Sequence, residues 1–199
     1  MNKIKFKNAQ NILMRMEIGE HFDPNNAFYI SGNISSETGK KACGWNIDNG
    51  GETKYGISQN AWPNISVKNL NSVLAEQLYI SQYWNTSKAE LLPEKLSICY
   101  YDAVVNMGLS GAGKLLQRIV GAKADGDVGP ITIAKLNECL KTKTDIQLAK
   151  SFQNARISFY HIIAHDKDNP ATTQNEDIHG KYESGWLNRI NRINKILLL

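Results

Sequence analysis

Cysteine and proline are scarce in this chain of 199 residues, which contains 3 Cys and 5 Pro. The cysteines, Cys43, Cys99 and Cys139, are odd in number and widely spaced, and the last two lie in apolar helical patterns. That usage favours neither a disulfide framework nor a zinc site, so buried free thiols are predicted. With 42% hydrophobic residues and few prolines, the chain is expected to fold as one globular unit.

Long apolar runs are also missing. The longest, such as "ILLL" at 196–199 and "AVV" at 103–105, fall far short of the roughly 20 residues that span a bilayer. No stable membrane insertion is therefore predicted. The basic N-terminus is followed by Arg15 and Glu17, where a signal peptide needs an apolar core and a cleavage site. Synthesis in the cytoplasm without a signal peptide is expected.

A strong charge of either sign is absent as well. The 23 Lys and Arg residues and 19 Asp and Glu residues leave a net charge of +4. A mildly basic surface favours polyanionic partners, and both nucleic acid and an anionic cell wall meet that description. On charge alone, an ordinary solvated surface explains the same numbers equally well.

What the chain does contain is apolar residues at helical spacing, which predicts a mainly α protein. Helices are expected over residues 8–20, 70–78, 93–107, 152–162 and 186–197, with a further helix beginning at Pro130. The intervening segment 21–47 is rich in Asn, Ser and Gly and is predicted to be a long loop, with or without a short hairpin. Long ordered loops are usually functional.

The stretch "GLSGAGKL" at 108–115 has the G-x-x-x-x-G-K spacing of a phosphate-binding loop. However, Leu115 replaces the Ser or Thr whose hydroxyl holds magnesium, and the preceding segment is predicted to be helix rather than strand. A turn between two helices is favoured over nucleotide binding.

Two patterns resemble metal-binding motifs, but each lacks a residue that the motif requires. His161 and His165 are four residues apart on a predicted helix, but Ile162 replaces the glutamate of H-E-x-x-H. The segment "DGDVG" from Asp125 would place Leu136 where a calcium loop has its bidentate glutamate. Structural roles are favoured for all of them, and neither a metal nor a cofactor is expected.

The N-terminal carboxylates point to a more specific chemistry. Hydrolysis of a glycosidic bond needs one carboxylic acid to protonate the leaving oxygen and usually a second carboxylate. Glu17, near the end of an apolar helix, and the later Asp48 and Thr53 supply these groups. The apolar neighbours Met16 and Ile18 favour partial desolvation of Glu17, which would raise its pKa and keep it protonated.

Thr53 lies within "NGGETKYGIS" at 49–58, a polar segment that follows Asp48 and whose glycines allow positive φ or a close backbone approach. It is predicted to be a tight hairpin or the wall of a site. "ILMRMEIG" at 12–19 and "DNGGETKYGIS" at 48–58 resemble the E-G-G-Y and D-x-G-G-x-T-x-Y-G-I-[ST] blocks of the glycosyl hydrolase family 108 muramidases, a group that includes phage endolysins and proteins labelled secretion activators. Later blocks follow in the family's order: "YWN", "LLP", "YDAVVNMG", "LLQRIVGAKADGDVGPIT", "RISFY" and "GWLNRIN".

The resemblance implies a lysozyme-like, mainly α fold with a small β-hairpin or loop lobe around residues 45–58. It implies cleavage of the β-1,4 bond between N-acetylmuramic acid and N-acetylglucosamine in peptidoglycan. A catalytic region over 1–110 and a peptidoglycan-binding region over 111–199 are expected, packed into one compact unit. The expected protein is a monomer that binds glycan strands, not nucleic acid, and reaches the cell wall through a holin or a dedicated export route.

The resemblance also assigns roles. Glu17 matches the family's catalytic acid, and the order of residues suggests Asp48 as second carboxylate and Thr53 as positioner of water or substrate. Four residues are expected to line the sugar cleft: Gly51, Tyr55, Trp45 and Asn106. Trp62 flanks the same loop, but a packing role is as good for it and for Trp45. A helix cap or core hydrogen bond is an equal alternative for Asn106.

Two departures from the family pattern matter. "EIGE" replaces E-G-G-Y, so Ile18 stands for the first glycine and Glu20 for the tyrosine, which makes Glu20 a rival for the acid role. The loop 21–47 is longer than usual for the family. Because of this insertion, an alternative remains open: a non-catalytic cell-wall-binding or secretion-accessory protein with the same fold. Whether the enzyme would invert or retain the configuration of the anomeric carbon depends on the distance between the two carboxylates.

Overall fold

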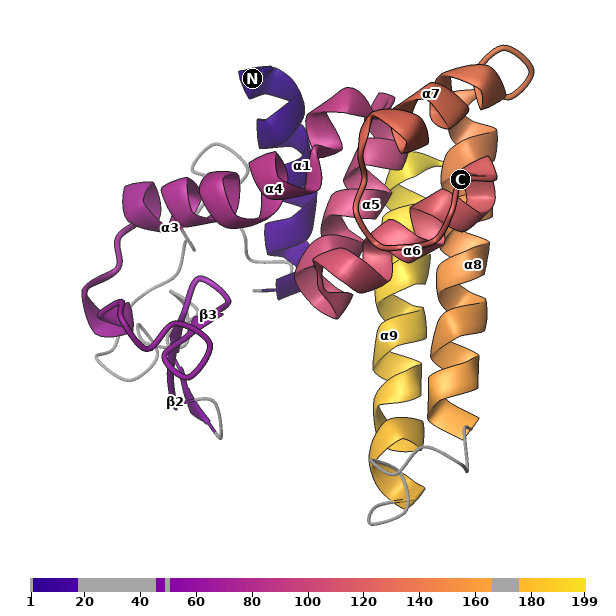
Figure 1. The fold of residues 1–199 in the computed structure, drawn as a ribbon. Helices are drawn as coiled ribbons and strands as arrows, with labels where there is room; N and C mark the ends of the chain where they lie inside the picture. The colour runs from indigo at the N-terminus through magenta and orange to yellow at the C-terminus, as the bar shows by residue number, and fades with distance from the viewer. Residues whose placement is uncertain (1, 18–45, 49–50, 166–175) are drawn as a thin grey trace. The chain divides into compact units, whose positions relative to one another are not determined.

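The computed structural model describes residues 2–17, 46–48, 51–165 and 176–199. The protein is mainly α with a small antiparallel sheet, as the sequence predicts (Figure 1). Among the described residues, no helix is both long enough and apolar enough to cross a membrane.

The chain separates into two compact units, Met1–Thr86 and Ser87–Leu199. This division falls before residues 94–107, whereas the sequence places the boundary between regions after them, at residue 110. The two divisions describe different properties, since one follows packing and the other follows resemblance. The sequence-based regions therefore stay a prediction.

The first unit opens with α1 (Lys3–Glu17), which buries Phe6, Leu13 and Met14 on one face. The helix ends at Glu17, close to the predicted end. Three strands come next: β1 (Asn46–Asp48), β2 (Gly51–Lys54) and β3 (Ile57–Ser58). The unit then ends with three short helical segments, which are η1 (Val67–Asn69), α3 (Ser72–Tyr79) and the π-helical η2 (Ile80–Trp84). Asn71 caps α3, because its Oδ1 accepts a hydrogen bond from the backbone N–H of Leu74 at 2.9 Å.

The strands form one antiparallel sheet in the order β1-β2-β3. Asn46 pairs with Thr53 and Asp48 with Gly51, which confirms that the predicted hairpin segment is β structure. The sequence did not anticipate β3, a strand of two residues that pairs with the end of β2. So short a strand carries too few residues for alternation to be recognised.

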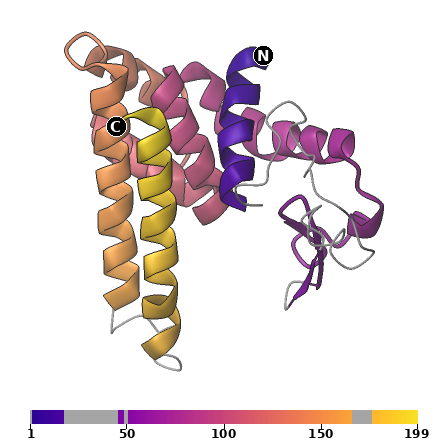
Figure 2. The ribbon, with the colours of Figure 1, turned by 180° about the vertical axis from the view of Figure 1, so that it is seen from behind.

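The second unit is a helical bundle made of these elements: α4 (Asn85–Ser87), which spans the boundary, η3 (Ala89–Leu91), α5 (Glu94–Met107), α6 (Leu109–Val120), α7 (Pro130–Cys139), α8 (Asp145–His165) and α9 (Glu176–Leu197). α5 packs against α6 and α8, and α8 and α9 lie side by side and antiparallel (Figure 2). Most of α5 is buried, including Leu96, Cys99 and Tyr101, as expected for a central helix.

Local signals explain where several helices begin. Pro130 is the first residue of α7, as predicted, because its fixed φ suits that position and its missing N–H costs nothing there. Asp145, in the first turn of α8, accepts hydrogen bonds from the backbone N–H groups of Lys95 (2.8 Å) and Leu96 (2.9 Å) at the start of α5. A single carboxylate thereby satisfies two donors that helix geometry leaves open.

The structure corrects the interpretation of "GLSGAGKL". Only Gly108, with φ +86°, forms a turn, and the rest belongs to α6. Gly113 is required for close packing, since a Cβ there would lie 2.5 Å from the carbonyl oxygen of Gly126. The turn predicted for the Asp125 segment is confirmed, and buried Gln117 holds it by donating to Asp125 Oδ1 at 2.7 Å and accepting from Gly126 N at 2.8 Å.

Two further predictions need correction. α9 begins at Glu176, ten residues earlier than the predicted helix at 186, because helical pairing with α8 extends into polar sequence. Cys99 is a buried free thiol as predicted, whereas Cys139 is only half-buried. Cys43 lies outside the described residues.

Candidate active site

Glu17 is the last residue of α1, and its side chain is exposed. The partial desolvation expected from its apolar neighbours is therefore not found. The residue lies against the turn between β2 and β3, since a Cβ added to Gly56 would be 3.5 Å from both Cβ and Cγ of Glu17. The end of α1 and this turn meet, although 38 residues separate Glu17 from Gly56 without counting the two themselves.

The turn that meets Glu17 has an unusual backbone. Tyr55 and Gly56 both have positive φ, +55° and +75°, which is the pattern of a type I′ hairpin turn. Positive φ is uncommon for a tyrosine and needs support from its surroundings. Tyr79 supplies it, because its hydroxyl donates a hydrogen bond to the Tyr55 carbonyl oxygen at 2.9 Å.

Aromatic side chains surround this meeting point. The ring of Tyr83 lies 5.6 Å from that of Tyr79 and 6.3 Å from that of Trp62, centroid to centroid. Tyr83 belongs to η2, and π-helical turns are frequent at functional sites. Tyr83 and Trp62 are both half-buried, so part of each ring remains accessible. We call Trp62, Tyr79 and Tyr83 the aromatic cluster.

The electrostatics of the cluster connect it to Glu17. Burial raises the pKa of the Tyr83 phenol, a hydrogen bond from the Trp62 side chain opposes that rise, and the charge of Glu17 adds to it. The Trp62 indole can only donate, so its N–H is the donor in this contact. The Tyr83 phenol is therefore neutral at neutral pH, and it lies near enough to Glu17 for that charge to contribute to its raised pKa.

Gly56→Ala is expected to damage this site beyond its cost in stability. The positive φ costs about 1–3 kcal/mol for an alanine, and the new Cβ would lie 2.9 Å from Tyr79 Oη and against Glu17. Gly121→Ala is the matched control, because its φ of +73° imposes the same strain while its Cβ would meet nothing within 4 Å. Urea unfolding should show a loss in both variants, larger for Gly56→Ala because of the added contact with Tyr79, whereas activity at this site should fall only for Gly56→Ala. Equal activity of the two variants would contradict the geometry.

The other predicted site residues fall on both described and undescribed parts of the chain. Asp48 ends β1, and Thr53 lies within β2 on the neighbouring strand, with Gly51 opposite Asp48. Trp45 and Glu20 lie outside the described residues. Tyr55 is half-buried in the turn, with the Lys54 ammonium 5.7 Å from the centre of its ring. Its expected role in stacking on a sugar stays a prediction.

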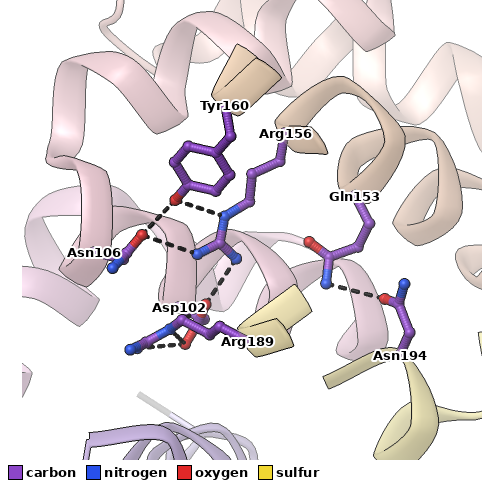
Figure 3. A network of polar contacts seen from close by, with 7 residues as sticks. All are labelled: Asp102, Asn106, Gln153, Arg156, Tyr160, Arg189 and Asn194. Atoms are coloured by element: carbon purple, nitrogen blue, oxygen red, sulfur yellow. Dashed lines mark hydrogen bonds and ion pairs between the residues drawn. The ribbon is translucent and has the colours of Figure 1, made fainter. Parts of the chain in front are cut away.

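Asn106 lies in the second unit and takes part in a polar network (Figure 3). Its Oδ1 accepts hydrogen bonds from the Tyr160 hydroxyl and from Arg156 Nη2, the latter at 3.3 Å. The structure therefore shows the hydrogen-bonding role that the sequence offered as the alternative to substrate binding. The residue itself is exposed, and contact with substrate stays a prediction.

Asp102, one turn before Asn106 on α5, is the centre of this network. It is buried and bridges two arginines, with Arg156 Nη1 at 2.7 Å and Arg189 Nη2 at 2.7 Å. Burial alone would raise the pKa of Asp102, but the two guanidinium groups outweigh it and hold the pKa below its ordinary value. The network joins α5, α8 and α9. The blocks "YDAVVNMG", "RISFY" and "GWLNRIN" thus contribute to the core of the second unit.

Tyr79 and Tyr83 were not predicted to be site residues. They are four apart across the end of α3 and the start of η2, a spacing that places side chains on one helical face. Together with the block "YWN" at residue 83, this spacing was the available signal. What the sequence could not supply is their contact with Trp62 and the β2–β3 turn, which depends on tertiary packing.

Comparisons with known proteins match two families at successive parts of the chain. The sequence model of glycosyl hydrolase 108 matches residues 34–108, and that of a predicted peptidoglycan domain matches residues 111–191. A solved structure of SagA from Brucella abortus is similar, with a TM-score of 0.65 and 22% sequence identity over 98% of this chain and 95% of that one. At this identity the likeness concerns the fold. No curated protein matches the chain. Together the family matches support a glycoside hydrolase that acts on peptidoglycan.

Proposed function

We propose that the protein is an N-acetylmuramidase, on the premise that residues 34–108 match the glycosyl hydrolase 108 family and residues 111–191 match the predicted peptidoglycan domain family. It cleaves the β-1,4 bond between N-acetylmuramic acid and N-acetylglucosamine by general acid catalysis. The observation that carries the proposal is the position of Glu17. An exposed carboxyl group at a helix end lies against the turn of a β lobe, beside the aromatic cluster.

In this proposal Glu17 protonates the oxygen of the leaving sugar. Glu17 precedes the residues matched by the hydrolase family, so its role rests on its position in the structure and on the resemblance of its sequence block. Asp48, at the end of β1, is proposed as the second carboxylate, acting on the anomeric carbon directly or through water. Thr53 on β2 is proposed to position that water or the substrate.

The aromatic cluster is proposed to hold the sugar that Glu17 acts on. A half-exposed indole offers a large, rigid apolar face with a polar edge, and the ring of Trp62 packs edge-on to that of Tyr83, with centroids 6.3 Å apart. The apolar faces of pyranose rings complement such surfaces. The region over 111–199 is proposed to attach the protein to the same polymer, which keeps the catalytic region over 1–110 near its substrate.

Trp62→Ala is expected to weaken binding of soluble peptidoglycan glycan fragments by roughly two- to tenfold, because one aromatic contact is worth about 0.5–1.5 kcal/mol beyond its buried area. Trp62→Phe should retain most of the affinity, since a ring remains. Calorimetric titration of both variants with reduced glycan oligomers measures the difference. If alanine and phenylalanine bind alike and both match the wild type, Trp62 is not part of the sugar site.

Release of soluble fragments from purified peptidoglycan tests the proposal against its alternative. A hydrolase clears the suspension and leaves fragments in the supernatant. A wall-binding or secretion-accessory protein would sediment with the wall and release nothing, and that result would overturn the enzymatic proposal. The expected locations of action, the cell wall or periplasm, follow from the substrate. Passage through a holin or a dedicated export route is part of the proposal.

A further inference from the structure

Two histidines and a glutamate meet on the surface of the second unit, far along the sequence from the residues proposed for hydrolysis. His161 and His165 lie one turn apart on α8, and Glu183 reaches them from α9. His161 Nδ1 is 2.5 Å from Glu183 Oε1, and His165 Nε2 is 3.4 Å from Glu183 Oε2. One ligand atom from each of the three residues can be chosen so that all lie within 4.8 Å of one another.

From this arrangement we infer that His161, His165 and Glu183 bind a divalent transition-metal ion of the Zn²⁺ type. Zn²⁺ binds imidazole nitrogen at about 2.0–2.1 Å and carboxylate oxygen at about 2.0–2.2 Å, so the ligand atoms of one ion lie roughly 3–4 Å apart. The observed separations require only small side-chain rotations to match. Two of the three donors are imidazole nitrogens, which disfavours Mg²⁺ and Ca²⁺, since these ions prefer oxygen ligands.

Glu183 adds a third possible ligand to the two histidines that the sequence pattern already suggested. Two histidines four apart on a helix can offer two ligands, but a stable site needs a third. The third comes from a separate helix, and the antiparallel packing of α8 against α9 brings it within reach. The sequence prediction that no metal is bound was made without this contact.

The ligand set also indicates what the ion does. Two histidines and a glutamate leave the fourth position of a tetrahedral ion open to water, which is the arrangement of several zinc peptidases. In H-E-x-x-H peptidases the residue after the first histidine is the general base, and here it is Ile162, which is 64% exposed. Lacking that carboxylate, the site is suited to fastening α8 to α9 near the helix ends rather than to hydrolysis.

Access and energetics agree with a reversible site. The His161 and His165 side chains are 52% and 71% exposed, while Glu183 is 16% exposed. An ion can therefore reach all three from solvent. Without the ion, the same residues form polar contacts on an exposed surface, and such contacts contribute little to stability. With it, the two helices are joined by bonds to a common centre, and any ion that binds only the folded state stabilises that state.

Titration of the metal-free, full-length protein with Zn²⁺ in a calorimeter tests the inference. One ion per chain is expected to bind, and the thermal midpoint should rise with added Zn²⁺. His161→Gln and Glu183→Gln should each weaken binding by more than about tenfold, because loss of even an outer-shell partner of a metal site costs about 10–100-fold. The double variant His161→Gln/His165→Gln should lose both the binding and the thermal shift.

His21→Gln is the matched control, since it removes a histidine outside the inferred site and should leave Zn²⁺ binding unchanged. Visible absorption of bound Co²⁺ supplies a second readout, because tetrahedral coordination by nitrogen and oxygen gives intense bands that hexaaqua Co²⁺ lacks. Absence of saturable Zn²⁺ binding would overturn the inference. Unchanged binding by the double variant would overturn it as well, since the ion would then sit elsewhere. Neither result depends on whether the protein hydrolyses peptidoglycan.

Discussion

Glu17→Gln is expected to fold like the wild type and to lose nearly all hydrolytic activity. An amide preserves the size of the side chain but cannot donate the proton that the leaving sugar needs, and general acid catalysis typically contributes about 10²–10⁴-fold to the rate. Because Glu17 is exposed at the end of α1, the substitution should leave the unfolding midpoint unchanged. Fragment release from purified peptidoglycan, with circular dichroism to verify folding, measures both effects.

Glu20→Gln is the comparison that separates the two candidate acids. Glu20 is three residues away along the chain, so it shares the local sequence but, on our proposal, not the catalytic role. It should retain most of the wild-type activity. An active Glu17→Gln variant beside an inactive Glu20→Gln variant would show that the acid has been assigned to the wrong residue.

Asp102→Asn is expected to destabilise the second unit by about 3–5 kcal/mol, the usual cost of removing one partner from a buried ion pair. The asparagine would leave Arg156, which is fully buried, and Arg189, which is 12% exposed, without the charge that now compensates both. Glu138→Gln is the matched control, since it breaks the exposed pair of Glu138 with Lys135. Surface pairs contribute little, so this control should unfold at nearly the same urea concentration as the wild type.

The contribution of Asp102 also predicts a pH dependence. Its folded-state pKa is held below the ordinary value by the two arginines, so the charged form is favoured in the folded state. The contribution of the Asp102 charge to the free energy of unfolding is fully present above the pKa of an aspartate in the unfolded chain, about 3.9. It is lost as the pH falls through the lower pKa that Asp102 has in the folded protein. The difference in unfolding free energy between wild type and Asp102→Asn should therefore be constant near neutral pH and shrink below about pH 4. A difference that stays constant into strong acid would contradict this account.

The predictable parts of the fold were those specified by neighbours in sequence. Apolar residues at helical spacing predicted a helix over residues 8–20, which the structure has as Lys3–Glu17, and Pro130 predicted the first residue of α7. Both signals act within a few turns of helix, so periodicity and backbone restriction suffice. The β lobe was anticipated from "NGGETKYGIS" for the same reason, although the positive φ at Tyr55 was not.

The parts that escaped prediction depend on contacts between distant segments. Nothing in the sequence near Glu17 indicates that Gly56 lies beside it, and nothing in the sequence near His161 indicates its contact with Glu183. The early start of α9 belongs to the same class, because packing against α8 supports helix in a polar segment whose own pattern argues against it. Asn106 shows the converse, since the sequence offered two roles and the contacts with Tyr160 and Arg156 display one of them.

Mass spectrometry of the products released from purified peptidoglycan, after borohydride reduction, tests the central claim most directly. Reduction marks whichever sugar carries the new reducing end. The account predicts fragments that end in reduced N-acetylmuramic acid from the wild type and none from Glu17→Gln. Fragments that end in reduced N-acetylglucosamine would show that the other glycosidic bond is cut. Absence of any fragment, with the protein sedimenting on the wall, would contradict the claim that this protein is a hydrolase.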